Sequence, residues 1–101
     1  MRFLMKVSMP VEAGNAAAKN GFAQIPSILA QQKPEAAYFF AECGRRTGLL
    51  IINMDHPSQL PAFAEPWFLT LNAAIEVTPV MLPEDLQKAG PAIADAVKNY
   101  G

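Results

Sequence analysis

Apolar and polar residues alternate at the start of the chain. From Arg2 to Met9 every second residue is apolar, and the residues between them include Lys6 and Ser8. Successive side chains of a β-strand point to opposite faces, so this pattern predicts a first strand, which Pro10 ends.

The segment Ala36–Met54 predicts a β-hairpin, because two apolar runs rich in aromatic and branched residues flank a polar turn at Gly44. Two registers remain open, one with Cys43 and Gly44 in the loop and one with Gly44 and Arg45. Both registers predict the same two faces. One face is wholly apolar and is expected to meet helices. The second is also strongly apolar, so we expect a second copy of the chain to cover it.

Two segments have a helical pattern. Residues 11–32 carry a core-facing apolar stripe, and Pro26 lies inside that stripe, which predicts a kinked helix or two short ones. Residues 57–71 carry a second stripe, after Asp55 as a candidate N-cap. Pro66 is expected to break this second helix.

Residues 74–81 alternate again and predict a fourth strand, which Pro79 places at a sheet edge or a bulge. A helical tail begins at Pro83 and is split by Gly90 and Pro91. The order β-α-β-β-α-β with a tail predicts one α+β domain over residues 1–101. Its fold is ferredoxin-like, with a four-stranded antiparallel sheet and the helices on one face.

Composition narrows the function classes. The 101 residues carry eight basic and nine acidic side chains without a block of one sign, which argues against a nucleic-acid surface. No apolar run approaches the roughly 20 residues of a membrane helix. The lone Cys43 excludes an intrachain disulfide and suits a reducing compartment, so we expect a cytoplasmic protein. One histidine and one cysteine do not make a metal site, and no motif indicates a cofactor.

The polar minority on the second sheet face gives the main candidate site. A dimer that closes over this face would place these residues in a mostly apolar cavity, the usual composition of a small-ligand site. A buried Lys6 is expected to need Glu76 as its partner. The alternative to a ligand site is that these residues serve only as a structural ion pair within the interface. The residues are Lys6, Ser8, Tyr38, Asn53, Glu76 and Thr78.

Other side chains have two interpretations each. His56, the only histidine, is either a general base oriented by a nearby carboxylate or a polar residue at a helix start. Trp67 is either a pocket wall or plain core. Arg45 and Arg46 either grip a carboxylate or phosphate or form a solvated turn.

Several segments together resemble a known group of proteins: NAAAKNG (15–21), KPEAAYF (33–39), GRRTG (44–48), AEPWF (64–68) and PVMLPEDLQKAGPAI (79–93). They are similar to the dimeric α+β barrel superfamily, and most of all to an uncharacterised family of small bacterial proteins within it. The resemblance implies the fold and a homodimer, and it implies no activity. The superfamily also holds cofactor-free monooxygenases, lactone isomerases, haem enzymes and stress-response proteins, but none of their catalytic residues can be placed here by motif.

Three functions remain open at this point. The first is a homodimer, joined through the sheet face, that binds a small, partly apolar molecule in a barrel cavity. The second is an enzyme similar to cofactor-free oxygenases or isomerases. The third is a structural or interaction protein whose sheet face serves assembly alone.

Overall fold

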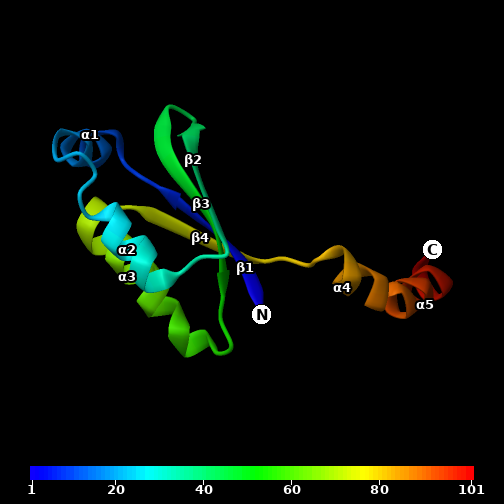
Figure 1. Cartoon of the computed structure of the whole chain (residues 1–101). Helices are drawn as coiled ribbons and strands as arrows, with labels where there is room; N and C mark the ends of the chain where they lie inside the picture. Colours follow the sequence, from blue (N-terminus) through cyan, green and yellow to red (C-terminus); the bar gives the residue numbers. More distant parts are fainter.

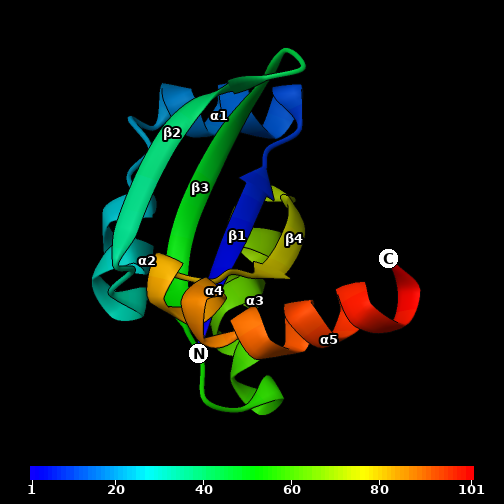
Figure 2. The same cartoon turned by 90° about the vertical axis from the view of Figure 1, so that its right-hand side faces the viewer.

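The computed structural model describes the whole chain, residues 1–101. The elements are β1 (Arg2–Ser8), α1 (Val11–Lys19), α2 (Ile25–Gln32), β2 (Ala36–Glu42), β3 (Arg45–Asn53), η1 (Pro57–Gln59), α3 (Leu60–Leu71), β4 (Ala74–Pro79), α4 (Pro83–Lys88) and α5 (Gly90–Tyr100). The four strands form one antiparallel sheet in the order β2-β3-β1-β4 (Figure 2). The predicted α+β, ferredoxin-like arrangement is therefore confirmed.

The helices α1, α2 and α3 lie on one side of the sheet (Figure 1). The core forms between them and the sheet. Met5 and Val7 of β1, Leu50 of β3 and Trp67 of α3 are fully buried there. The other side of the sheet, called the open face below, has no helix packed over it. Its apolar residues are Leu4, Tyr38, Phe40, Leu49 and Ile51.

The strand pairing confirms the faces predicted from alternation. Lys6 of β1 lies opposite Leu49 of β3 and opposite Glu76 of β4. In the hairpin, Glu42 pairs with Arg45. The loop is therefore Cys43–Gly44, the first of the two registers left open by the sequence. Both loop residues have positive φ, 53° and 75°, as a tight hairpin turn requires.

The first helical segment divides into two short helices, one of the two outcomes predicted. Residues 20–24 separate α1 from α2, and Gly21 and Phe22 among them have positive φ, 64° and 53°. Pro26 lies in the first turn of α2, where its missing N–H costs no helical hydrogen bond.

The predicted break at Pro66 is wrong, because α3 runs without interruption from Leu60 to Leu71. Proline lacks the N–H that would pair with the carbonyl four residues earlier, that of Ala62. The side chain of Gln32 replaces it. Its Nε2 donates to the carbonyl of Ala62 at 3.3 Å and to that of Phe63 at 2.9 Å. The Oε1 of Gln32 accepts from Nε1 of the buried Trp67 at 3.1 Å.

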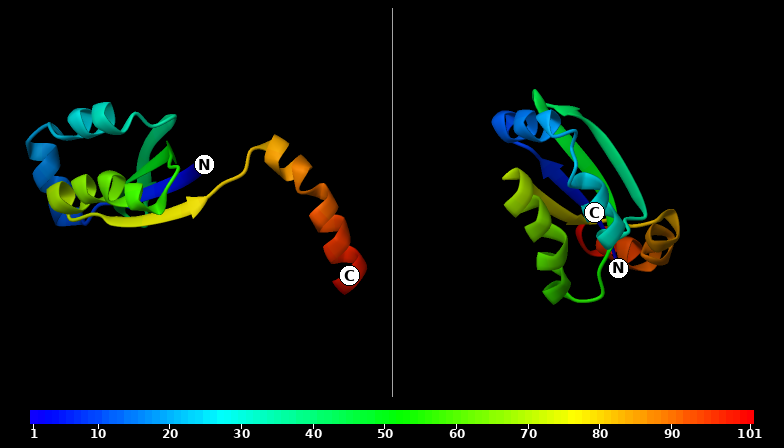
Figure 3. Two further views of the ribbon diagram at one scale, coloured as in Figure 1. Left: turned by 90° about the horizontal axis from the view of Figure 1, so that it is seen from below. Right: turned by 60° about the vertical axis from the view of Figure 1, so that its left-hand side comes forward.

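Residues 81–101 form a helical arm that projects from the body (Figure 3). The chain extends 57 × 28 × 20 Å, with a radius of gyration of 17.0 Å. A compact chain of this length would have a radius of about 13 Å. The fourth strand ends at Pro79, earlier than predicted, and the tail is divided at Gly90 as expected. None of the helices combines the length and the apolar character that crossing a membrane requires.

Candidate functional site

A pocket of about 380 Å³ lies where the hairpin meets the turn between α1 and α2. We call it the hairpin pocket. Its volume falls within the roughly 300–1,000 Å³ of small-ligand sites. Its walls are mostly apolar, with one charged group. The lining residues are Met9, Phe22, Ile25, Phe39, Phe40, Arg46 and Thr47.

The strand β2 brings two aromatic rings to this pocket. Phe39 lies across from Gly48 on β3, and a Cβ at position 48 would stand only 3.1 Å from the Phe39 ring. Glycine at this position therefore leaves room for the ring. Phe40 is the next residue and points to the opposite face, yet it also lines the pocket. The pocket thus extends to the free edge of β2.

Arg46 provides the positive charge of the hairpin pocket. Its Nη1 donates to Oδ1 of Asn15 at 2.9 Å, and its guanidinium carbon lies 5.9 Å from the centre of the Phe22 ring. A Cβ at Gly14 would stand 3.0 Å from Nη1, so the glycine in α1 permits this approach. The ion pairs of the chain are Arg2–Glu35, Lys6–Glu42 and Lys6–Glu76. Arg46 therefore holds its charge without a carboxylate partner.

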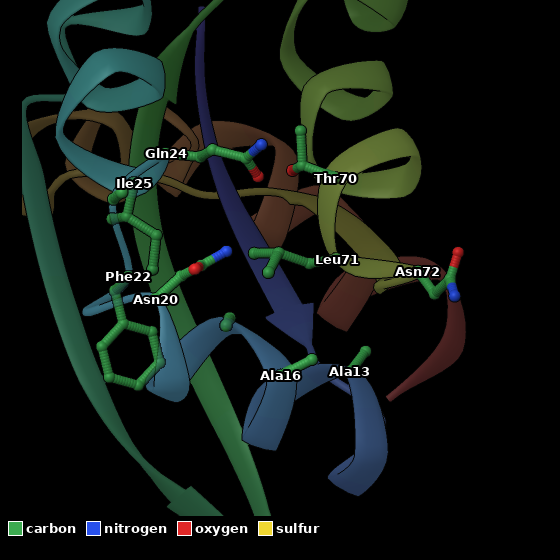
Figure 4. A pocket seen from close by; sticks show the side chains of 11 residues that line it. Ala13, Ala16, Asn20, Phe22, Gln24, Ile25, Thr70, Leu71 and Asn72 are labelled. Atoms are coloured by element: carbon green, nitrogen blue, oxygen red, sulfur yellow. The ribbon is translucent and has the colours of Figure 1, made fainter.

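Phe22 holds an unusual backbone conformation at the edge of the same pocket. A bulky residue with positive φ is uncommon, and such residues concentrate at functional sites. The N–H of Phe22 donates to the carbonyl of Ala17 at 2.8 Å, which fixes the turn. Its ring borders a second pocket of about 320 Å³ between α1 and the end of α3, where Leu71 and Asn72 also lie (Figure 4).

The chemistry of the hairpin pocket is that of a binding site. Its walls hold no carboxylate, histidine or thiol. The Thr47 hydroxyl donates to the carbonyl of Arg45 at 3.1 Å. An apolar cavity with one guanidinium suits a molecule with an apolar body and an anionic group, because guanidinium binds carboxylates and phosphates through paired hydrogen bonds.

Three of the predicted site residues lie together elsewhere, at the hairpin end of the open face. Lys6, Ser8 and Glu76 border a smaller pocket of about 170 Å³. The Nζ of Lys6 is 2.7 Å from Oε1 of Glu42 and 3.9 Å from Oε2 of Glu76. The hydrogen bond that Lys6 donates to Glu42 is the main cause that raises the pKa of Lys6 above its usual value. The expected partner Glu76 is thus the more distant of two carboxylates.

The other five predicted site residues are dispersed, and one of them, Thr78, is exposed on β4. Tyr38 is 63% exposed on the open face, and Asn53 is exposed at the end of β3. His56 is exposed in the loop before η1, where its backbone N–H donates to Oε1 of Gln59 at 3.1 Å. Trp67 is fully buried in the core against α2.

An ion pair at the other end of the open face joins β1 to the start of β2. The Arg2 guanidinium contacts both carboxylate oxygens of Glu35, with Nη2 at 2.7 Å from Oε1 and Nε at 2.8 Å from Oε2. The hydrogen bonds from Arg2 lower the pKa of the Glu35 carboxyl. The same pairing raises the pKa of Arg2.

The hairpin pocket was not predicted from the sequence as a site. Phe22 and Phe39 fit the apolar stripes of a helix and a strand and were therefore expected in the core. Arg46 was considered as an anion ligand, with a solvated turn as the alternative. The available signal was the glycines: Gly14 and Gly48 stand within otherwise regular elements, which indicates close approach by another group.

Comparison with known proteins gives one family. A family model described as "Domain of unknown function (DUF3303)" matches residues 1–94, which includes the whole sheet, α1–α4 and the start of α5. The search of curated proteins finds no match to this chain.

Proposed function

Because the chain belongs to the DUF3303 family, whose function is unknown, we propose a function from the geometry itself: it binds a small molecule with an apolar body and an anionic group. The ligand occupies the hairpin pocket. Its anionic group contacts Arg46, and its apolar body lies between Phe22 and Phe39.

A single observation carries this proposal, namely that Arg46 is a cation without an acidic partner at an apolar pocket. Arg46 is exposed near the start of β3, yet its guanidinium is held in place. Here Asn15 and the ring of Phe22 fix the guanidinium, and Gly14 makes space for it. Fixing the side chain before a ligand arrives reduces the entropy cost of binding.

We further propose that the protein is a homodimer of the dimeric α+β barrel type, joined through the open face. Tyr38 and Phe40 are 63% and 41% exposed there, beside the half-buried Leu4, Leu49 and Ile51. Adjacent apolar residues on a sheet without helical cover are typical of an interface. Phe40 belongs to both the open face and the hairpin pocket, so the second copy would border the ligand.

The two alternative functions have weaker support. A cofactor-free oxygenase or isomerase needs a group that removes a proton, and the hairpin pocket contains no carboxylate or imidazole. A purely structural role would explain the exposed Tyr38 and Phe40. It would not explain why Arg46 and Phe22 are fixed at a cavity.

Ligand binding is tested with matched pairs of compounds. An aryl or medium-chain carboxylic acid and the corresponding alcohol are each titrated against the protein by calorimetry. A charge-assisted hydrogen bond contributes roughly 1.5–3 kcal/mol, so we expect the acid to bind at least about tenfold more tightly. Arg46→Gln should abolish this preference, while Arg45→Gln should retain it. Binding of neither compound at millimolar concentration, or a preference that survives Arg46→Gln, would refute the proposal.

The homodimer is tested by sedimentation equilibrium. The wild-type chain should sediment as a dimer, and Tyr38→Glu should weaken association because it places a charge in the apolar face of both copies. Leu69→Glu is a matched control, since Leu69 is 80% exposed on α3, on the opposite side of the sheet. A monomeric wild-type protein would contradict the proposed interface.

A further inference from the structure

The helical arm presents an apolar stripe that its own chain leaves uncovered. Ile93, Val97 and Tyr100 follow the spacing of one helix face, and they are 49%, 63% and 90% exposed. α5 contacts α4 and stands clear of the sheet and of α1–α3 (Figure 3). A stripe of this kind normally faces a partner surface.

Packing against a partner would also stabilise the arm as a helix. Helices shorter than about 12–15 residues are marginal in water by themselves, and most helical stability in proteins comes from packing of an amphipathic face. α5 has 11 residues and α4 has six. The family match includes α4 and extends into α5, so the arm belongs to the family's domain.

The direction of the arm indicates which partner it meets. It leaves the body at the end of β4 and projects on the side of the open face, away from α1–α3 (Figure 1, Figure 2). A second copy seated on the open face would occupy this same space. Packed sheets lie about 10 Å apart, and α4 and α5 together hold about 25 Å of helix, so the arm is long enough to pass a partner's sheet and reach its helical layer.

The body offers a groove that matches the stripe. It lies between α3 and β4, has a volume of about 320 Å³, and is lined by Leu60, Pro61, Ala64, Glu65, Phe68, Ile75 and Val77. From Leu60 to Phe68 it follows about 12 Å of helix, and the stripe from Ile93 to Tyr100 spans about 10 Å. Glu65 lies at the groove, and Lys98 stands beside the stripe with the opposite charge.

We infer that the two copies exchange their arms, so that the α5 stripe of each lies in the α3–β4 groove of the other. This inference rests on the proposed homodimer and adds a second contact to it. Only alternate residues of the four strands point to the open face. The sheet alone therefore offers fewer than the roughly 20–30 residues per side of a stable interface. The exchanged arms supply the remainder, and each copy then carries both a stripe and a groove, as two-fold symmetry requires.

Two matched pairs of variants of the full chain test the contact by sedimentation equilibrium. Ile93→Asp charges the stripe, and Asn99→Asp puts the same charge on another face of α5. Phe68→Asp charges the groove, and its control Leu69→Asp changes a neighbouring residue that is 80% exposed. We expect the first of each pair to weaken dimerisation about tenfold or more, because truncating a central interface residue has effects of this size. Each control should change it less than about threefold.

Cross-linking of the wild-type chain provides evidence that does not depend on any variant. Isotopically labelled and unlabelled proteins are refolded together and treated with a lysine-reactive reagent. Arm exchange predicts peptides that join Lys98 of one copy to Lys19 or Lys33 of the other, recognised by their mixed isotope content. Links confined to one chain, or equal dimerisation of Ile93→Asp and Asn99→Asp, would overturn the exchange.

The remaining outcomes distinguish this inference from the proposals on which it rests. A weakened Ile93→Asp dimer with an unaffected Phe68→Asp dimer would show that the groove assignment is wrong. A wild-type dimer that neither Ile93→Asp nor Phe68→Asp weakens would overturn the arm exchange and retain the open-face interface. A wild-type monomer would overturn both the interface and the exchange, whereas the carboxylate titration at Arg46 is read independently of either.

Discussion

Gln32 should be a principal determinant of stability, because one side chain completes the hydrogen bonding of a proline-containing helix and of a buried tryptophan. Gln32→Met keeps the length of the side chain and removes its polar atoms. The Nε1 of Trp67, in a residue with 0% exposure, would then lose its acceptor. A buried donor without a partner costs about 1–3 kcal/mol. Ala62 is exposed, so water can hydrate its freed carbonyl, and the cost falls mainly on Trp67.

We therefore expect Gln32→Met to lower the free energy of unfolding by about 2 kcal/mol. At about 4–8 °C per kcal/mol for a domain of this size, the melting temperature should fall by roughly 8–16 °C. Urea unfolding followed by far-ultraviolet circular dichroism measures the free energy directly. Gln31→Met is the matched control on the exposed side of α2, and its effect should stay within about 0.5 kcal/mol.

A double-mutant cycle with Trp67→Phe separates the hydrogen bond from general packing. Phenylalanine has no N–H, so in this background Gln32→Met should cost about 1 kcal/mol less than in the wild type. Equal effects of Gln32→Met and Gln31→Met would refute the bridging role. Equal effects in the two Trp67 backgrounds would show that the Nε1 bond contributes nothing measurable.

Three further predictions concern other parts of the chain. Gly14→Ala places a Cβ 3.0 Å from Nη1 of Arg46, so the flexible Arg46 side chain should move. The affinity for a carboxylate ligand, measured by calorimetry, should then fall several-fold, while the melting temperature should stay nearly unchanged. Gly48→Ala sets a Cβ against the Phe39 ring and should lower the free energy of unfolding by about 1–3 kcal/mol. An unchanged midpoint of urea unfolding would contradict this packing. The folded-state pKa of Glu35 is lowered, so its contribution to stability is present above the unfolded pKa near 4.5 and is lost as the pH falls through the folded pKa. Glu35→Gln should therefore be less stable than wild type at pH 7 and lose less stability on acidification, and parallel melting curves from pH 7 to pH 3 would exclude this contribution.

The sheet could be predicted from the sequence because alternation sets both the strands and their faces. A shift of one residue would move Met5 and Val7 from the core to the open face, so the apolar pattern allows one register there. The hairpin turn was ambiguous by one position, because Gly44 suits either loop. Pairing of Glu42 with Arg45 resolves it through contacts between the strands.

The features that could not be predicted from the sequence depend on contacts between residues far apart in the chain. Pro66 was expected to break α3 since local rules count only the hydrogen bond that proline removes. The replacement comes from Gln32, and nothing in the composition of either helix indicates that pairing. The same holds for the hairpin pocket, where Phe22 and Arg46 meet through the α1–α2 turn. Alternation placed Lys6 beside Glu76 correctly, but side-chain length allowed the closer contact with Glu42.

The strand order has a consequence for biosynthesis. β1 precedes the other three strands in the chain, yet it lies inside the sheet and pairs with β3 and β4 on its two sides. The hairpin β2–β3 can form early because its strands are adjacent in the chain, whereas β1 keeps one unpaired edge until residues 74–79 have emerged. An apolar strand with an open edge favours intermolecular pairing. During synthesis this chain should therefore depend on chaperones until β4 is available, and expression at low temperature should raise its yield.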